Sequence, residues 1–202
     1  MLEAMAAHDA PSPPDRADEL TDILASSDWF LATLDRVATV DPPRWWVGAG
    51  VIRDLVWDTR FGDGFDPSRL KDVDVAYFDG TDLTTDREVG LASELREMDP
   101  SITWDVKNQA AVHQWYPARF GLDVQPFQSV SEAVATWPEY AACVAVRHGD
   151  AGSLLLLAPH GLDDLLDGVW RRNPTRVTPE EYERRFRRKD PASRWTGVRV
   201  AG

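Results

Sequence analysis

The stretch from residue 45 to residue 79 constrains the fold more than any other part of this chain. Residues 45–47 form a short apolar run with the character of a strand, and this run breaks at Gly48-Ala49-Gly50. A helix is expected at 51–57 and a second strand at 72–78. Strands that alternate with helices predict a sheet flanked by helices, so we expect an α/β (α+β) domain with a mixed sheet.

The second strand of this stretch begins with two aspartates on one face. Asp72 and Asp74 are two residues apart, and side chains alternate along a strand, so both carboxylates point to the same side. Two adjacent carboxylates repel each other unless a cation lies between them, and hard oxygen ligands suit Mg²⁺. The pair therefore predicts a site for Mg²⁺ (or Mn²⁺). The alternative is that both residues are solvated at the start of a strand.

The glycine turn before the helix also has two interpretations. Gly48 and Gly50 can provide a tight turn with positive φ and nothing more. Alternatively, the free backbone N–H groups of Gly48, Ala49 and Gly50, together with the positive end of the helix, bind phosphate. Arg53 lies in the first turn of the helix, where it can reach a phosphate or pair with Asp54 or Asp58.

A third strand, expected at 102–107, supplies another candidate carboxylate. Alternation places Asp105 on a polar face with Thr103 and Lys107. The polar residues at its end, Lys107, Asn108 and Gln109, form a cluster that is expected to contact a nucleotide. The alternatives are a surface ion pair between Asp105 and Lys107, and a helix N-cap at Asn108.

Several segments resemble a known family. The sequence VGAGVIRDL at 47–55 resembles the VGGxVRD opening of the tRNA nucleotidyltransferase branch. In order, the segments GAGVIRD, LKDVDVAYFD, WDVKNQAAVH, WPEYAACVAVR and APHGLDDLL resemble a bacterial nucleotidyltransferase-like family, formerly catalogued as a domain of unknown function, within the DNA polymerase β-like nucleotidyltransferase superfamily. The resemblance covers residues 45 to 195. Gly50 and Asp72 are 22 positions apart, wider than in most of the superfamily, and a loop is expected at 61–69.

The resemblance implies transfer of a nucleoside monophosphate from an NTP to an acceptor hydroxyl by a two-metal mechanism. In that reading Asp72 and Asp74 bind both metal ions, and Asp105 completes the second metal site and accepts the hydroxyl proton. Gly48 and Gly50 hold the β- and γ-phosphates. Two alternatives stay open: a non-catalytic nucleotide-binding or regulatory protein of the same fold, and a metal-dependent phosphohydrolase.

The charge of the chain bears on its partners. Its formal net charge is −12, which argues against a general nucleic-acid binder. The charge is uneven: residues 171–189 carry eight Arg or Lys and three Glu, whereas residues 1–170 carry 12 basic and 30 acidic residues. We therefore expect NTP as a ligand, and a small-molecule or protein acceptor rather than nucleic acid. The basic helix expected at 179–189 is either a solvated face or a clamp on an anion.

The length of 202 residues suits a single domain. We expect a disordered N-terminus at 1–15 and one domain at 16–202, with a helical addition at 16–43, a catalytic core at 44–128 and a C-terminal part at 129–202. Strands at 142–147 and 153–157 are expected to form a hairpin, followed by a helix at 161–169. The single cysteine, Cys143, is expected to be a buried thiol. The sequence shows no membrane span or signal peptide, so a cytoplasmic location is expected, and the oligomeric state is left open.

Overall fold

The chain folds around a five-stranded mixed sheet with strand order β3-β2-β1-β4-β5. A computed structural model describes residues 15–201. The strands are β1 (Trp46–Gly48), β2 (Val73–Tyr77), β3 (Trp104–Asn108), β4 (Ala145–His148) and β5 (Leu154–Leu157). β1 runs antiparallel to both β2 and β4, β2 and β3 are parallel, and β4 and β5 form the expected hairpin. The predicted mixed sheet flanked by helices is confirmed.

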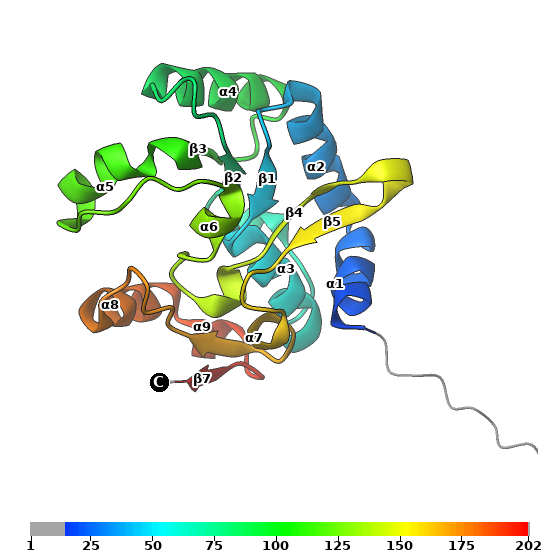
Figure 1. The fold of residues 1–202 in the computed structure, drawn as a ribbon. Coiled ribbons are helices and arrows are strands. Elements are labelled where there is room, and N and C mark those ends of the chain that lie inside the picture. Colours follow the sequence, from blue (N-terminus) through cyan, green and yellow to red (C-terminus); the bar gives the residue numbers. More distant parts are fainter. Residues whose placement is uncertain (1–14, 202) are drawn as a thin grey trace, which may run out of the picture.

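Helices cover the sheet and extend the domain at both ends (Figure 1). They are α1 (Arg16–Ala25), α2 (Asp28–Val40), α3 (Gly50–Phe61), α4 (Thr85–Met98), α5 (Val112–Phe120), α6 (Val130–Val134), α7 (Asp163–Leu166), α8 (Pro179–Lys189) and α9 (Pro191–Arg194). Short 3₁₀ helices occur at η1 (Pro67–Arg69), η2 (Gln109–Ala111), η3 (Tyr140–Ala142) and η4 (Asp150–Gly152). No helix within residues 15–201 combines the length and apolar character that crossing a lipid bilayer requires.

The expected helix at 161–169 is wrong beyond Leu166. Gly168 adopts a positive φ of 65°, which ends the helical path. The next residues form β6 (Val169–Arg171), which pairs in parallel with β7 (Arg199–Ala201) in a separate two-stranded sheet. The partner strand lies about thirty residues further along the chain, so local periodicity carries no sign of this pairing.

The two N-terminal helices form where capping residues predict them. The Ser27 side chain accepts a hydrogen bond from the Phe30 N–H at the start of α2. Asp41, with a positive φ of 50°, ends that helix before Pro42. The expected disorder at 1–15 falls on residues outside the described range, except for Asp15, which caps α1.

The two faces of the sheet bury different clusters. Helices α1 to α4 pack with the larger cluster, which includes Val47, Val75 and Val106. The smaller cluster contains Ala76, Val134 and Cys143. Cys143 is buried, as expected, and this burial raises the pKa of its thiol to about 12. Figure 1 shows α5, α6 and α8 gathered on the side of the sheet away from α1 and α2.

A buried charge network joins the C-terminal segment to α3. Arg194 binds Asp54 through Nη1 at 2.8 Å and Asp58 through Nη2 at 2.6 Å. The Trp195 Nε1–H also donates to Asp58 at 2.7 Å. The Asp54 and Asp58 side chains are almost fully buried, so both carboxylates depend on these partners. The network holds the helix that follows the glycine turn against the end of the chain.

Removing Arg194 should therefore be strongly destabilising. We expect Arg194→Met to lower the free energy of unfolding by about 3 kcal/mol, because the buried Asp58 loses its ion pair and the buried Asp54 keeps only its pair with Arg53. Urea denaturation measures the change. Arg187→Met is the matched control: within residues 15–201, Arg187 forms an ion pair only with the exposed Glu183, and its loss should cost about 0.5 kcal/mol or less. Equal effects of the two substitutions would contradict a structural role for the network.

Candidate functional site

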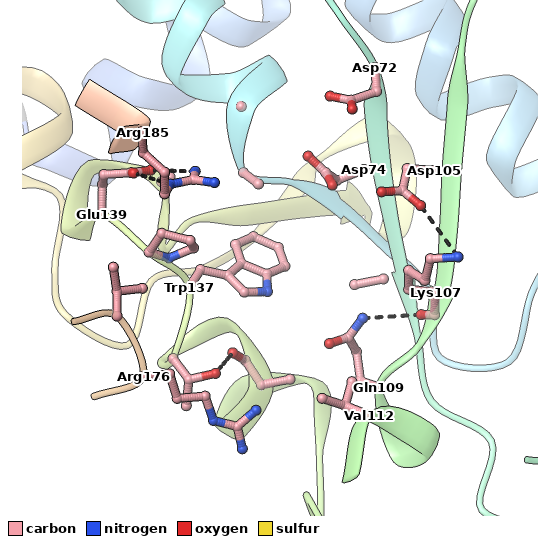
Figure 2. Close-up of a pocket in the computed structure, with 18 of the residues that line it drawn as sticks. Asp72, Asp74, Asp105, Lys107, Gln109, Val112, Trp137, Glu139, Arg176 and Arg185 are labelled. Carbon is pink, nitrogen blue, oxygen red and sulfur yellow. Dashed lines mark hydrogen bonds and ion pairs between the residues drawn. The ribbon is translucent and has the colours of Figure 1, made fainter. Parts of the chain in front are cut away.

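A cavity of about 380 Å³ lies on the face of the sheet that carries Asp74 and Ala76. Its wall combines the ends of β2 and β3, the start of α3, and residues of α5, α6 and α8. Figure 2 shows three carboxylates on one side of the cavity, from Asp72, Asp74 and Asp105. The cavity thus brings together segments from most of the chain.

Strand pairing explains how the carboxylates meet. Asp74 of β2 lies directly opposite Asp105 of β3 in a parallel pair, so both side chains project from the same face. Asp72 lies directly before β2 and lines the same cavity. Burial, followed by the charges of Asp72 and Asp105, raises the pKa of Asp74 to about 7. Burial is therefore the main reason that the charged form of Asp74 is disfavoured, and the two neighbouring carboxylates add to it, while Lys189 offsets part of the effect.

The three carboxylates differ in their partners. Asp72 pairs with Lys71 Nζ at 2.9 Å, and Asp105 lies 3.5 Å from Lys107 Nζ. Lys107 also binds Glu88 at 3.2 Å, so Asp105 has only a share of that cation. Among residues 15–201, no lysine or arginine forms an ion pair with Asp74. Asp105 therefore forms the ion pair with Lys107 that the sequence offered as an alternative, and it also faces the cavity.

The carboxylates suit a hard divalent cation by their chemistry. In the part of the chain that the structure describes, no three His, Cys, Asp or Glu side chains are grouped closely enough to hold a metal ion as they stand. Mutual repulsion opposes a closer approach of Asp72, Asp74 and Asp105 without a cation. Their oxygen donors and the raised pKa of Asp74 fit the expectation of Mg²⁺ or Mn²⁺.

The glycine turn differs from the expected phosphate cradle. Positive φ does not occur at Gly48 or Gly50, but at Ala49, where φ is 58° and ψ is −122°. The Ala49 N–H donates to the Val144 carbonyl at 3.1 Å, so that N–H is already engaged. Ala49 and Gly50 line the cavity, whereas Gly48 does not. The backbone of Gly50 acts to lower the pKa of Asp74, but burial of that carboxyl raises it more strongly.

Gly48 is required for packing. A Cβ at this position would lie 2.6 Å from the Val144 carbonyl oxygen and 2.8 Å from Cη2 of Trp137. Both distances are too short for a side chain, so only glycine allows this close approach. Trp137 lines the cavity, and the absence of a side chain at Gly48 makes room for its ring.

The remaining predicted site residues divide into two groups. Arg53, Lys107 and Gln109 line the cavity. The Arg53 side chain is only 2% exposed and pairs with Asp54 at 2.6 Å, which favours the helix-holding interpretation of this arginine. Gln109 Nε2 donates to the Lys107 carbonyl at 3.1 Å.

Asn108 lies outside the cavity wall. Its Oδ1 accepts from the backbone N–H groups of Asp79 and Ala110, and its Nδ2 donates to the carbonyls of Asp79 and Asp82. The side chain is fully buried and its hydrogen bonds are satisfied within the protein. These four bonds hold the Asn108 amide away from the cavity. They favour the alternative interpretation of Asn108 as a cap over the predicted contact with a nucleotide.

Several cavity residues were not singled out from the sequence. Trp115, Trp137 and Arg176 are examples of these residues. Helix α8 has the predicted bounds 179–189 and adds basic side chains. In total, eight lysines or arginines and five carboxylates line the cavity, a formal excess of three positive charges in a chain of net charge −12. The sign asymmetry of residues 171–189 was the available signal.

Comparisons with known proteins agree with this architecture. A family model described as Nucleotidyltransferase matches residues 35–200. No curated protein matches the chain. An NMR structure described as revealing a CCA-adding enzyme head domain is 25% identical, with a TM-score of 0.76 over 92% of this chain and 95% of that one.

Two larger structures share the fold. A CCA-adding enzyme in complex with CTP has a TM-score of 0.56 at 14% identity over 91% of this chain. The Thermotoga maritima CCA-adding enzyme in complex with tRNA has a TM-score of 0.55 at 13% identity, also over 91%. The chain spans 43% and 42% of their lengths, so it corresponds to less than half of each.

The unusual backbone at Ala49 predicts opposite effects at neighbouring positions. Ala49→Gly should raise the free energy of unfolding by about 1 kcal/mol, because glycine adopts this φ and ψ without a Cβ penalty. Gly48→Ala should lower it by about 2 kcal/mol or more, because the new Cβ overlaps Val144 and Trp137. Thermal unfolding of both variants tests the pair. A destabilised Ala49→Gly would show that the alanine conformation is not strained.

The raised pKa of Asp74 predicts a pH-dependent effect on stability. Between about pH 4 and 7 the folded protein holds a proton on Asp74 that the unfolded chain, with a pKa near 3.8, has released. This carboxyl therefore weakens folding as pH rises through that window. In metal-free buffer, Asp74→Asn should match the wild type at pH 4 and exceed its unfolding free energy above pH 7 by on the order of 2–4 kcal/mol. A difference that does not change with pH would contradict the charge cluster.

Proposed function

Because the chain belongs to the nucleotidyltransferase family, we propose that it transfers a nucleoside monophosphate from an NTP to an acceptor hydroxyl and releases pyrophosphate. The observation that carries this proposal is the pairing of Asp74 with Asp105 on parallel strands, which faces two carboxylates into a cavity beside a third. A carboxylate cluster opposite a basic helix supplies both kinds of group that phosphoryl chemistry requires.

The carboxylates would hold divalent cations. Asp72, Asp74 and Asp105 are the residues that would bind Mg²⁺ or Mn²⁺, and the bound ions would neutralise the triphosphate and polarise the α-phosphate. Burial and the neighbouring carboxylates raise the pKa of Asp74, so a cation beside it would stabilise its charged form. Asp72 lies directly before β2, so the two contribute from one segment.

Asp105 is suited to accept a proton. Its side chain is 44% exposed, in contrast to the deeper Asp74, so an acceptor hydroxyl can reach it from the cavity. The hydroxyl oxygen forms a bond to the α-phosphorus while the bond from that phosphorus to the pyrophosphate oxygen breaks. The hydroxyl proton passes to Asp105, and pyrophosphate leaves with the bonding electrons. Lys107, 3.5 Å away, holds the Asp105 carboxylate in place.

Helix α8 supports binding of the triphosphate. Its side chains Arg188 and Lys189 line the cavity, and neither forms an ion pair with another residue in the range 15–201. Burial and the nearby charge of Arg53 lower the pKa of Lys189, so an anion in the cavity would relieve an unfavourable concentration of positive charge. Arg185 is held by Glu139 at 2.7 Å and anchors the helix to the cavity wall.

The acceptor is proposed to be a small molecule or a protein hydroxyl. The chain as a whole is strongly acidic, which disfavours a long polyanion. The structure solved with tRNA belongs to a protein more than twice the length of this chain, so tRNA binding does not transfer to it from the shared fold. The basic cavity suits an NTP, whose charge is confined to a few atoms.

Substitutions of the carboxylates should separate binding from chemistry. We expect Asp74→Asn to abolish Mg²⁺-dependent NTP binding. Asp105→Asn should bind Mg·NTP nearly as the wild type does, yet lose transfer by about a hundredfold or more, because it lacks the proton acceptor. Isothermal titration measures binding, and incorporation of radiolabel from α-labelled NTP into acceptors of a cell extract measures transfer.

Asp63→Asn is the matched control, since Asp63 is exposed and does not line the cavity. Loss of NTP binding in both Asp105→Asn and Asp74→Asn would contradict the assignment of binding to Asp74 and of proton transfer to Asp105. Release of phosphate or pyrophosphate without any labelled acceptor would instead indicate a phosphohydrolase. Binding without any turnover would indicate a non-catalytic nucleotide-binding protein.

A further inference from the structure

The end of the cavity away from the carboxylates carries an arginine between two aromatic rings. The guanidinium carbon of Arg176 lies 4.2 Å from the ring centroid of Phe127 and 5.0 Å from that of Tyr116. The Tyr116 hydroxyl also donates to the Arg176 carbonyl at 3.4 Å. These contacts hold both the backbone and the guanidinium of Arg176 and limit the orientations of its donors.

Arg176 has no hydrogen-bond acceptor of its own. In the described chain its guanidinium donates no hydrogen bond and joins no ion pair, although the side chain is half-buried. Other arginines of the cavity are satisfied: Arg53 binds Asp54, and Arg185 binds Glu139. A partly desolvated cation without an acceptor is unfavourable, so a ligand that supplies acceptors here would gain free energy of binding.

The position of Arg176 relative to the carboxylates fits the length of a nucleotide. Figure 2 shows the ring of Trp137 between the carboxylate side of the cavity and Arg176. With the triphosphate at Asp74 and the basic helix α8, the base would extend over Trp137 toward Arg176. An indole ring is a suitable surface for stacking of a nucleobase. The close packing of Trp137 against Gly48 keeps that ring in place.

We propose that Arg176 selects the base of the NTP, and that it favours bases with two adjacent hydrogen-bond acceptors, which are cytosine and guanine. This inference rests on the proposed nucleotidyl transfer, because it assigns the second end of the same cavity. It goes further by naming the residue that discriminates among NTPs and the class of base that it accepts.

The chemistry of the guanidinium group determines this preference. Arginine carries only donors, arranged in a planar fork that binds two neighbouring acceptors. Guanine presents N7 beside O6, and cytosine presents N3 beside O2. Adenine places an amino donor beside its N1 and N7 acceptors, and uracil places an N–H between its two carbonyls. A fork of donors is therefore matched by cytosine or guanine and opposed by a donor in adenine or uracil.

Binding of the four NTPs and of inorganic tripolyphosphate, each with Mg²⁺, tests the proposal by isothermal titration. We expect the wild type to bind CTP or GTP at least about tenfold more tightly than ATP and UTP. The preferred nucleotide distinguishes cytosine from guanine. Arg176→Lys keeps the charge but loses the fork, and it should bind the four NTPs with affinities within a few-fold of one another. Arg176→Met keeps the packing between the rings and should lose the preference as well.

Tripolyphosphate has no base, so its affinity should be the same in the wild type and in both variants, which also shows that the variants fold. Arg119→Lys is the control for a cavity arginine, because Arg119 is exposed, and it should retain the preference. The assignment of Arg176 would be overturned by equal binding of the four NTPs, by a preference for ATP or UTP, or by an unchanged preference in Arg176→Lys. In each of these cases, binding of tripolyphosphate would leave the proposed function intact. Failure of the wild type to bind tripolyphosphate or any NTP would overturn both.

Discussion

The parallel pairing of β2 with β3 is the constraint on which the candidate site depends. It sets Asp74 opposite Asp105, so two carboxylates share one face at the distance of neighbouring strands. A slip of one residue would turn one of them to the apolar face, where Val75 and Val106 are buried. The same register that completes the core therefore concentrates negative charge in the cavity. Burial of Asp74, together with the charges of Asp72 and Asp105, raises the pKa of its carboxyl to about 7.

The opposite wall of the cavity offsets this charge. Helix α8 brings basic residues to a protein that is acidic overall, and the cavity has a formal excess of three positive charges. The helix is fixed through the ion pair between Arg185 and the buried Glu139, and the following segment is fixed through Arg194. The buried charges of the domain thus anchor the C-terminal segment, while Arg188 and Lys189 line the cavity without an ion pair to any residue of the range 15–201.

The turn before α3 was expected to bind phosphate, but its glycine at position 48 is explained by packing. Gly48 is glycine because the Val144 carbonyl and Trp137 approach it closely. Ala49 adopts the positive φ that the flanking glycines were expected to adopt, and its N–H binds Val144. The turn shapes the cavity by placing Trp137 and by bringing the backbone of Gly50 close enough to Asp74 to oppose the rise in the pKa of its carboxyl. Its contribution to the cavity is therefore the shape and polarity of the wall.

The sequence by itself determined the mixed sheet flanked by helices, the bounds of α8 and the polar face of Asp105, because these depend on local periodicity. Tertiary structure alone decided which strand lies beside β2, the pairing of β6 with β7, and the inclusion of Trp137 and Arg176 in the cavity. The tertiary structure also decided between a nucleotide contact and a cap for Asn108, because its amide binds carbonyl groups of a distant loop. Local patterns specify the face on which a side chain lies, whereas its neighbours across strands and cavities are set by long-range packing.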